Sequence, residues 1–544
     1  MSHYRAATNG QSSNANSSQG NTSVRHNTSH LKERSTYGDE YGELDGKPVI
    51  NFFFFVDYKN ELDELPKVFR ADIEKKITQD AKAKGSLMDA VFSFFANEYG
   101  ELAALSSEEL ALLEYTDKDI LDEAKAKATK TRERIAMLLR IGALPPTLKE
   151  RTELFKQTEE RYWRRKLRRR INRLSVHASN LLALIGVNAP HRIAAPNIKK
   201  RFLAMQERSE QFKSKMLIWD GTGQPVSLAE VATTYGQRMA ESLCIMNALE
   251  RLAEERGHTW SFITLTLPPR LHPNPALGRQ SWDRTPVYKS VEYINERWRR
   301  IRAMFAKSKI RVNGVRVAEA HEDGCFHNHI LLFHDAAHYN AICRIVKHHF
   351  NESEHQAKIA LNNGKAKATS YAFKYIQKSN TVHDSKGNDS AFGTNSSERG
   401  KVIANQALRS ACGVRALAWL GIPKGTITKW RLLGRARRLP ACFIPLDQLV
   451  KGRDFLGVLR LNRAIEITKS MMVNAYGESK QKITGLAFKG VQWIKQTFSL
   501  FRSSRLVTVI QHYPRLAEQQ TYATATNFID EQLAPNPPPV ISTS

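Results

Sequence analysis

Hydrophobic and polar residues alternate with period two in three short segments of the chain. The first is Ser261–Leu267, and the other two are Val315–Ala320 and His327–Phe333. Because successive side chains of a strand point to opposite faces, this alternation predicts half-buried β-strands. The last two segments are joined by Asp323-Gly324, a dipeptide typical of tight hairpin turns. The sequence therefore predicts an antiparallel pair within a larger sheet.

Helical periodicity surrounds these segments. Trp298, Ile301 and Phe305 recur at three- and four-residue spacing within residues 295–307, which is typical of an amphipathic helix. Further helices are predicted over about 338–350 and 369–378. Strands that alternate with helices around an antiparallel pair predict an α+β fold, with a central antiparallel sheet and flanking helices.

The net charge of the chain indicates the kind of partner that it binds. The chain of 544 residues has 82 Lys and Arg against 54 Asp and Glu, so the formal net charge is +28. Such an excess is unusual for an enzyme of small metabolites and favours a polyanionic partner, although charge alone does not separate DNA from RNA. Arg164 and Arg165, in a basic segment that begins Tyr162-Trp163, predict a helix that contacts phosphates.

Composition also bears on the compartment. The five cysteines include no C-x-x-C pair, which predicts a reducing compartment without a disulfide framework or zinc ribbon. The first residues lack an apolar signal core, and no apolar run approaches the roughly 20 residues of a membrane span. We therefore expect a cytoplasmic protein with no membrane partner.

Changes in composition divide the remainder of the chain. A helix is expected over 106–140, beginning at a Ser106 cap, and another over 226–256, ending at Gly257. Leu417–Leu420 and Thr426–Leu433 are expected to be two helices around a tight turn; two packed helices are favoured, and a DNA-binding helix-turn-helix remains an alternative. The expected units are a disordered tail (1–45), a mostly helical accessory domain with a first strand at Val49–Val56 (46–150), a basic helical DNA-binding region (151–256), a core α+β domain (257–380), a flexible loop (381–402), a basic helical region (403–440), a C-terminal region of unknown role (441–530) and a second disordered tail (531–544).

Two histidines and a carboxylate form the first candidate site. His327 and His329 lie two apart on a predicted strand and so face one side of the sheet. The hairpin turn brings Glu319 across from them, and two imidazoles with one carboxylate leave open positions on a divalent metal. His321 or Glu322 remain alternatives to Glu319 as the third ligand.

A pair of tyrosines forms the second candidate site. Tyr371 and Tyr375 are four apart on a predicted helix, so their phenols lie on one face, about 6 Å apart along the axis. Lys374 and Lys378 make the segment basic, and a nearby cation favours the phenolate form of a nucleophile. On the first predicted strand and the loop after it, Thr264, Thr266 and His272 are candidates to line the path of a nucleic acid.

These motifs, in this order, resemble the HUH endonucleases and in particular the bacteriophage replication gene A protein family. The resemblance rests on Phe262-Ile263-Thr264-Leu265-Thr266-Leu267-Pro268, then His327-Asn328-His329, then Tyr371 to Tyr375, and it extends over roughly residues 150–440. Asn328 departs from the pattern, since the superfamily name implies a bulky hydrophobic residue there. The resemblance implies that residues 257–380 are the HUH endonuclease catalytic domain.

The resemblance also implies an activity and its partners. His327, His329 and Glu319 would hold Mg²⁺ or Mn²⁺ at a phosphate of single-stranded or melted origin DNA. One tyrosine would form a 5′-phosphotyrosine link and free a 3′-OH primer for rolling-circle replication, and the second tyrosine would act on the regenerated origin. The chain shows no G-x-x-x-x-G-K-[ST] motif, so we expect a host helicase and a host DNA polymerase as partners in a bacterial cell.

Three other functions remain open on the sequence. A relaxase or a transposase of the same superfamily shares the three motifs. A non-catalytic DNA-binding regulator would use the basic helices alone. A zinc hydrolase is less favoured, because the chain has no H-E-x-x-H motif.

Overall fold

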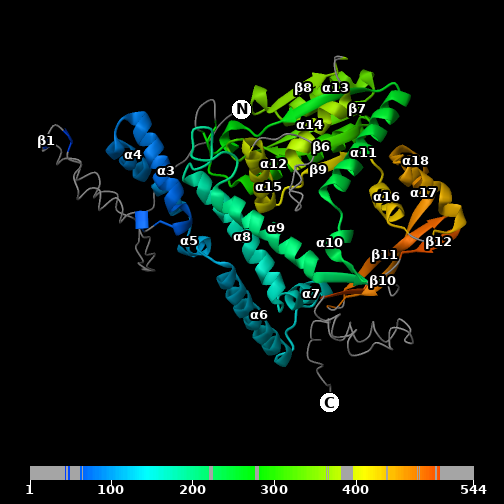
Figure 1. Cartoon of the computed structure of the whole chain (residues 1–544), viewed down its shortest axis with the longest axis horizontal. Helices are drawn as coiled ribbons and strands as arrows, with labels where there is room; N and C mark the ends of the chain where they lie inside the picture. The colour runs from blue at the N-terminus through cyan, green and yellow to red at the C-terminus, as the bar shows by residue number, and fades with distance from the viewer. Residues whose placement is uncertain are drawn as a thin grey trace, which may run out of the picture.

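Figure 1 shows a computed structural model with a central sheet, a helical part on the N-terminal side and a small C-terminal sheet. The predicted tails (1–45 and 531–544) and the predicted strand Val49–Val56 lie outside the described residues, apart from Glu43–Leu44. The structure describes residues 43–44, 47–48, 62–63, 65–219, 225–275, 281–362, 364, 367–380, 396–436, 439–474, 476, 478–495 and 499–502.

Helices are the most abundant elements of the described chain. No described helix is both long enough and apolar enough to cross a membrane. The α-helices are α3 (Lys67–Lys84), α4 (Leu87–Phe94), α5 (Ser107–Leu113), α6 (Asp117–Arg140), α7 (Leu148–Lys156), α8 (Glu160–Leu181), α9 (Pro196–Lys215), α10 (Leu228–Val231), α11 (Tyr235–Glu255), α12 (Val287–Lys307), α13 (Tyr339–His349), α14 (Ala368–Asn380), α15 (Ser396–Cys412), α16 (Thr426–Gly434), α17 (Ile444–Lys451) and α18 (Phe455–Arg460).

The strands of the described residues form four antiparallel sheets, and the largest has the order β8-β5-β7-β6-β9. The smaller sheets have the orders β1-β2, β13-β3-β4 and β10-β11-β12. The strands are β1 (Glu43–Leu44), β2 (Lys47–Pro48), β3 (Met216–Trp219), β4 (Val226–Ser227), β5 (Thr259–Leu265), β6 (Asn313–Ala320), β7 (Phe326–His334), β8 (Ala357–Leu361), β9 (Leu417–Leu420), β10 (Ile465–Val473), β11 (Ser479–Phe488), β12 (Val491–Ile494) and β13 (Ser499–Arg502).

The five-stranded sheet is covered by helices on both faces, which confirms the predicted α+β fold. Alternate residues of β7 enter different cores: Ile330 and Leu332 join the core that contains α12 and α13, while Leu331 and Phe333 join the core that contains α11 and α14. The predicted hairpin is confirmed, since β6 and β7 pair antiparallel around the turn. His329 has the parity of Leu331, so it faces the side of the sheet on which α14 lies.

A separate hydrophobic core is formed mainly by helices of the N-terminal part of the chain. Phe69 and Ile73 of α3 and Phe94 of α4 are fully buried there, together with Ile171 of α8. The segment 106–140 is two helices rather than the one expected. Ser106 caps α5 with a capping box as predicted, and Thr116 caps α6 with a second one. The first helix therefore ends at Leu113, and a new helix begins at Asp117.

Three other local predictions are corrected by the structure. Leu417–Leu420 is not a helix but strand β9, because it pairs with β6 at the edge of the main sheet. The flexible loop expected over 381–402 extends too far, since α15 begins at Ser396, and residues 381–395 lie outside the described residues. The helix expected over 226–256 is instead β4, α10 and α11, with Thr234 capping α11.

Candidate active site

The central hairpin brings one carboxylate and two imidazoles together. Glu319 of β6 is directly opposite His327 of β7, and His329 follows on the same face. The Nε2 atom of His329 lies 2.9 Å from Oε2 of Glu319, and the Nε2 atom of His327 lies 3.6 Å from the same oxygen. The two Nε2 atoms are 3.2 Å apart. One ligand atom from each residue thus lies within 4.8 Å of the other two, so the three side chains could hold one metal ion.

Electrostatics favour the ionised carboxylate of Glu319 and the neutral imidazole of His327. Burial alone would raise the pKa of Glu319, but the neighbouring imidazoles of His327 and His329 outweigh it and hold the pKa well below its ordinary value. Burial lowers the pKa of His327, which favours the neutral imidazole. Nδ1 of His329 is 3.2 Å from Oγ1 of Thr264, so that hydroxyl orients the ring with Nε2 toward Glu319. One carboxylate and two imidazoles are ligands that divalent cations commonly take in proteins, and three ligands leave positions open for water or substrate.

The alternative third ligands are engaged elsewhere. His321 Nδ1 lies 3.2 Å from a carboxylate oxygen of Asp323, although its ring is 5.8 Å from that of His327. Glu322 forms an ion pair with Arg192 at 2.9 Å. Among the three alternatives, Glu319 is the residue whose carboxylate meets both histidines.

Helix α14 places Tyr375 against the cluster, with Tyr371 beside it. The ring centroid of Tyr375 is 4.0 Å from that of His329, and the two tyrosine rings are 5.9 Å apart, as the i, i+4 spacing predicts. Phe262 of β5 packs against both rings, 4.6 Å from Tyr371 and 5.0 Å from Tyr375. Burial, and then the neighbouring Tyr371, raise the pKa of Tyr375 to about 12. At neutral pH the phenol therefore keeps its proton unless a cation stabilises the phenolate.

The other candidate residues are spread more widely. Lys374 is exposed on α14, and Lys378 lies on the same helix with its side chain outside the described part. Thr266 follows β5, and its backbone N–H donates to the carbonyl of Gln356. The remaining two, Arg164 and Arg165, lie on α8, which packs against α6 and α9 rather than against the cluster.

The tip of the hairpin is held by a buried carboxylate that the sequence reading missed. Asp323 was read only as a turn residue, yet it is fully buried and accepts a hydrogen bond from Nδ1 of His272. It also accepts from the backbone N–H of Cys325 at 2.9 Å, and His321 is its second histidine neighbour. Burial would raise the pKa of Asp323, but the hydrogen bond from His272 and the nearby imidazole of His321 hold it well below its ordinary value. His272 thereby ties the loop after β5 to the hairpin that carries Glu319 and both histidines.

Replacing this carboxylate is expected to destabilise the protein. Asp323→Asn removes a buried, charge-assisted acceptor, so we expect a loss of about 2–3 kcal/mol in the free energy of unfolding at neutral pH. Because the folded-state pKa of Asp323 is depressed, its contribution is present above the unfolded pKa of about 4 and is lost as the pH falls through the folded value. The difference between wild type and variant should therefore narrow below about pH 4. Denaturant unfolding from pH 3 to pH 7 measures both effects.

Glu322→Gln is the matched control for this variant. It removes a neighbouring carboxylate that is partly exposed and paired with Arg192 at the surface, where such pairs contribute little. An Asp323→Asn variant as stable as this control at neutral pH would contradict the role of Asp323 in holding the hairpin.

Fold and site together define a class: an α+β protein whose antiparallel sheet presents a carboxylate and two histidines to a helix with paired tyrosines. The chain belongs to the bacteriophage replication gene A protein family, whose model matches residues 101–382. No solved structure matches the chain.

Several curated proteins are similar to the chain over part of its length. It is 24% identical to the replication protein of Haemophilus phage HP1 over 415 residues, which are 70% of this chain and 52% of that protein. It is 25% identical to a probable replication protein of Pseudoalteromonas phage PM2 over 408 residues, 69% of this chain and 62% of that one. It is 31% identical to a probable replication endonuclease from a prophage-like region of Salmonella typhi over 221 residues, 37% of this chain and 27% of that one. The chain thus spans little more than half the length of the first two relatives.

Proposed function

We propose that this protein is a replication-initiation endonuclease that nicks one DNA strand at an origin with a tyrosine nucleophile. The observation that carries the proposal is the 4.0 Å separation between the rings of Tyr375 and His329, which sets a phenol beside the carboxylate–histidine cluster. The names of the relatives support the same activity, since several are replication proteins or probable replication endonucleases. The net charge of +28 supports a DNA substrate.

The residues of the site account for each part of the reaction. Glu319, His327 and His329 would hold a divalent cation, which when bound polarises a phosphate and stabilises negative charge. The phenol oxygen of Tyr375 attacks phosphorus, and the bond from phosphorus to the 3′ oxygen breaks. The phenolic proton is released as the new bond forms, and the departing oxygen takes up a proton to become a free 3′-OH. The products are a 5′-phosphotyrosine link and a primer end.

The second tyrosine extends the proposal to rolling-circle replication. The rings of Tyr371 and Tyr375 are 5.9 Å apart on one helix, so a second phenol remains at the site while the first is esterified. Tyr371 would cut the regenerated origin, and the new 3′-OH would attack the first phosphotyrosine and close a circle. A host helicase and a host DNA polymerase would unwind and extend the strand.

DNA contacts are proposed for the basic and polar residues around the site. Lys374 and Lys378 lie on the tyrosine helix, where a cation would favour phenolate and neutralise phosphate charge. Arg164 and Arg165 of α8, with Thr264, Thr266 and His272 near β5, are the other proposed contacts to the strand.

A covalent adduct is the direct test of this function. Purified protein is incubated with Mn²⁺ and labelled single strands, both random and from candidate origins, and is then run on a denaturing gel. We expect label that migrates with the protein and disappears in EDTA. Tight, salt-dependent DNA binding without any adduct would contradict the endonuclease proposal and favour a non-catalytic regulator. Strand transfer without a requirement for an origin would favour a relaxase or transposase.

A further inference from the structure

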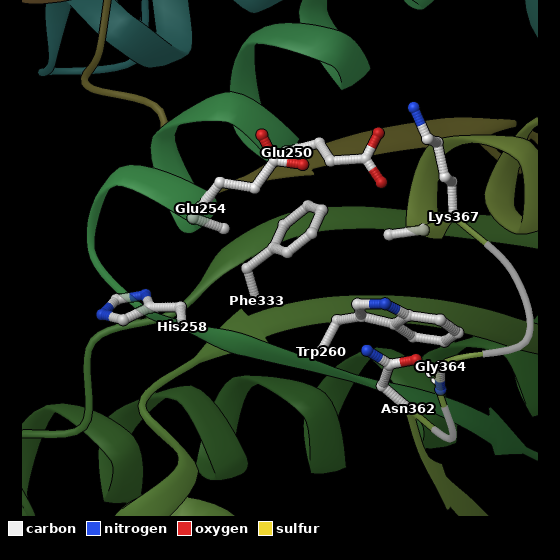
Figure 2. Close-up of a pocket in the computed structure, with 10 residues that line it drawn as sticks. Glu250, Glu254, His258, Trp260, Phe333, Asn362, Gly364 and Lys367 are labelled. Carbon is white, nitrogen blue, oxygen red and sulfur yellow. Dashed lines mark hydrogen bonds between the residues drawn. The ribbon is translucent and has the colours of Figure 1, made fainter.

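A pocket of about 350 Å³ lies beside the tyrosine helix, on the same side of the sheet as the cluster. Glu250 and Glu254 of α11 line one wall, and Trp260 of β5 and Phe333 of β7 line the sheet side. Figure 2 shows the two carboxylates above the ring of Phe333, with the indole of Trp260 opposite and Lys367 at one end. The volume is at the lower end of the range of about 300–1,000 Å³ that is usual for ligand sites.

The pocket and the cluster belong to one row of side chains. Trp260 pairs with Phe333, and Thr264, four residues further along β5, pairs with His329. Four residues of strand separate the pairs by about 14 Å, from a rise of roughly 3.4 Å per residue. The ring of Trp260 is 6.0 Å from that of Tyr371, so Trp260 connects the pocket to this tyrosine, which is partly exposed. A strand held at the tyrosines could therefore reach the pocket within a few nucleotides.

The lining of the pocket suits a flat ring with hydrogen-bond donors at its edge. Trp260 and Phe333 offer aromatic surface, on which any nucleobase stacks. Carboxylates accept hydrogen bonds and repel phosphate, so the base rather than the backbone faces Glu254. Glu250 is partly engaged, since its Oε1 accepts the backbone N–H of Thr369 at 3.3 Å at the start of α14. Lys367, exposed at the rim, is placed for the phosphate that follows the base.

We propose that this pocket binds a single nucleobase of the DNA strand that reaches the tyrosines, and that it selects a base with an exocyclic amino group. The inference rests on the proposed function in taking DNA as the substrate. Adenine, cytosine and guanine each present an amino donor, and carboxylates accept from such donors, whereas thymine carries no amino group. The pocket thus gives the site a preference for base identity near the cut that the histidines and tyrosines, which contact phosphate, do not supply.

Binding of homopolymers tests the preference without knowledge of an origin. Fluorescence anisotropy is measured with the full chain in EDTA, using labelled oligo(dC), oligo(dA) and oligo(dT) of equal length. Phosphate contacts are the same in all three, so the ratio of affinities isolates the contribution of the bases. We expect the wild type to bind oligo(dC) and oligo(dA) about ten-fold more tightly than oligo(dT).

Two variants connect that ratio to the pocket. Glu254→Ala, at an exposed helical position, should reduce the preference several-fold while the affinity for oligo(dT) stays the same. Trp260→Leu should weaken the affinity for each of the three oligomers by about five-fold or more, because a stacking surface is lost. Glu255→Ala is the matched control, because it removes an equal charge from the next residue of α11, which pairs with Arg460 outside the pocket.

The outcomes separate this inference from the proposed function. Equal affinities for the three oligomers in the wild type, or a preference that Glu254→Ala leaves unchanged, would overturn the base pocket even if the protein nicks DNA. A preference that Glu254→Ala abolishes and Glu255→Ala preserves supports the pocket even if no covalent adduct ever forms.

Discussion

His329→Ala should abolish DNA cleavage, lowering its rate by at least about a thousand-fold, because the site loses a ligand for the cation that polarises the phosphate. His329 is the buried centre of the cluster, with Nε2 at 2.9 Å from Glu319 and 3.2 Å from Nε2 of His327. DNA binding should stay nearly unchanged, since the proposed DNA contacts lie on other residues. Adduct formation and anisotropy on the same DNA measure the two effects.

The same variant also tests the metal independently of activity. Mn²⁺ should raise the melting temperature of the wild type, because an ion that binds only the folded state stabilises it, and this shift should be lost in His329→Ala. His355→Ala is the control, since that histidine is 86% exposed and pairs only with its neighbour Glu354. Equal cleavage by wild type in Mn²⁺ and in EDTA would refute the metal assignment.

Replacing both tyrosines by phenylalanine should remove every covalent adduct. Phenylalanine keeps the ring packing around Phe262 and removes only the nucleophilic oxygen, so the fold should persist. Of the single variants, Tyr375→Phe should lower the rate of the first cleavage more, by about a thousand-fold or more. The reason is that the ring of Tyr375 is the one that packs against His329. Tyr371→Phe should retain the first cut and lose the joining of strands into circles.

Adduct gels and a circle-formation assay measure these two steps separately. Tyr339→Phe, on α13 across the sheet, is the matched control and should behave as the wild type. Adduct that survives in the double variant would exclude these residues as nucleophiles, and equal losses in the two single variants would show that the phenols exchange roles in the first cut.

The sequence predicted the parts of the site that depend on short-range periodicity. Period-two parity placed His327 and His329 on one face, and helical spacing set Tyr371 beside Tyr375. Strand β9 was missed because Leu417–Leu420 becomes a strand only by pairing with β6, about 100 residues earlier in the chain, and no local pattern records that pairing.

The contact between Asp323 and His272 and the proposed base pocket could not be predicted from the sequence, because both are formed by tertiary structure. Asp323 forms an ordinary turn with Gly324, and only the fold brings His272 to it from the loop after β5. The pocket joins Glu254 from one helix with Trp260 and Phe333 from two strands. The sequence did contain a pattern for one wall of this pocket. Trp260, Phe262 and Thr264 are two residues apart on β5, so they share one face of the sheet and place a row of aromatic rings beside the histidines.

The position of the ligands within one hairpin has a consequence for the order of folding. The three proposed metal ligands, Glu319, His327 and His329, lie on the two strands of one hairpin. Closing its short loop has a small entropic cost, and hairpins form within microseconds. The tyrosines arrive only when α14 packs against the sheet, a contact of higher sequence separation that closes more slowly. A nascent chain would therefore bring its proposed metal ligands together before its proposed nucleophile is in place, and reactivity would wait for the packing of α14 against the sheet.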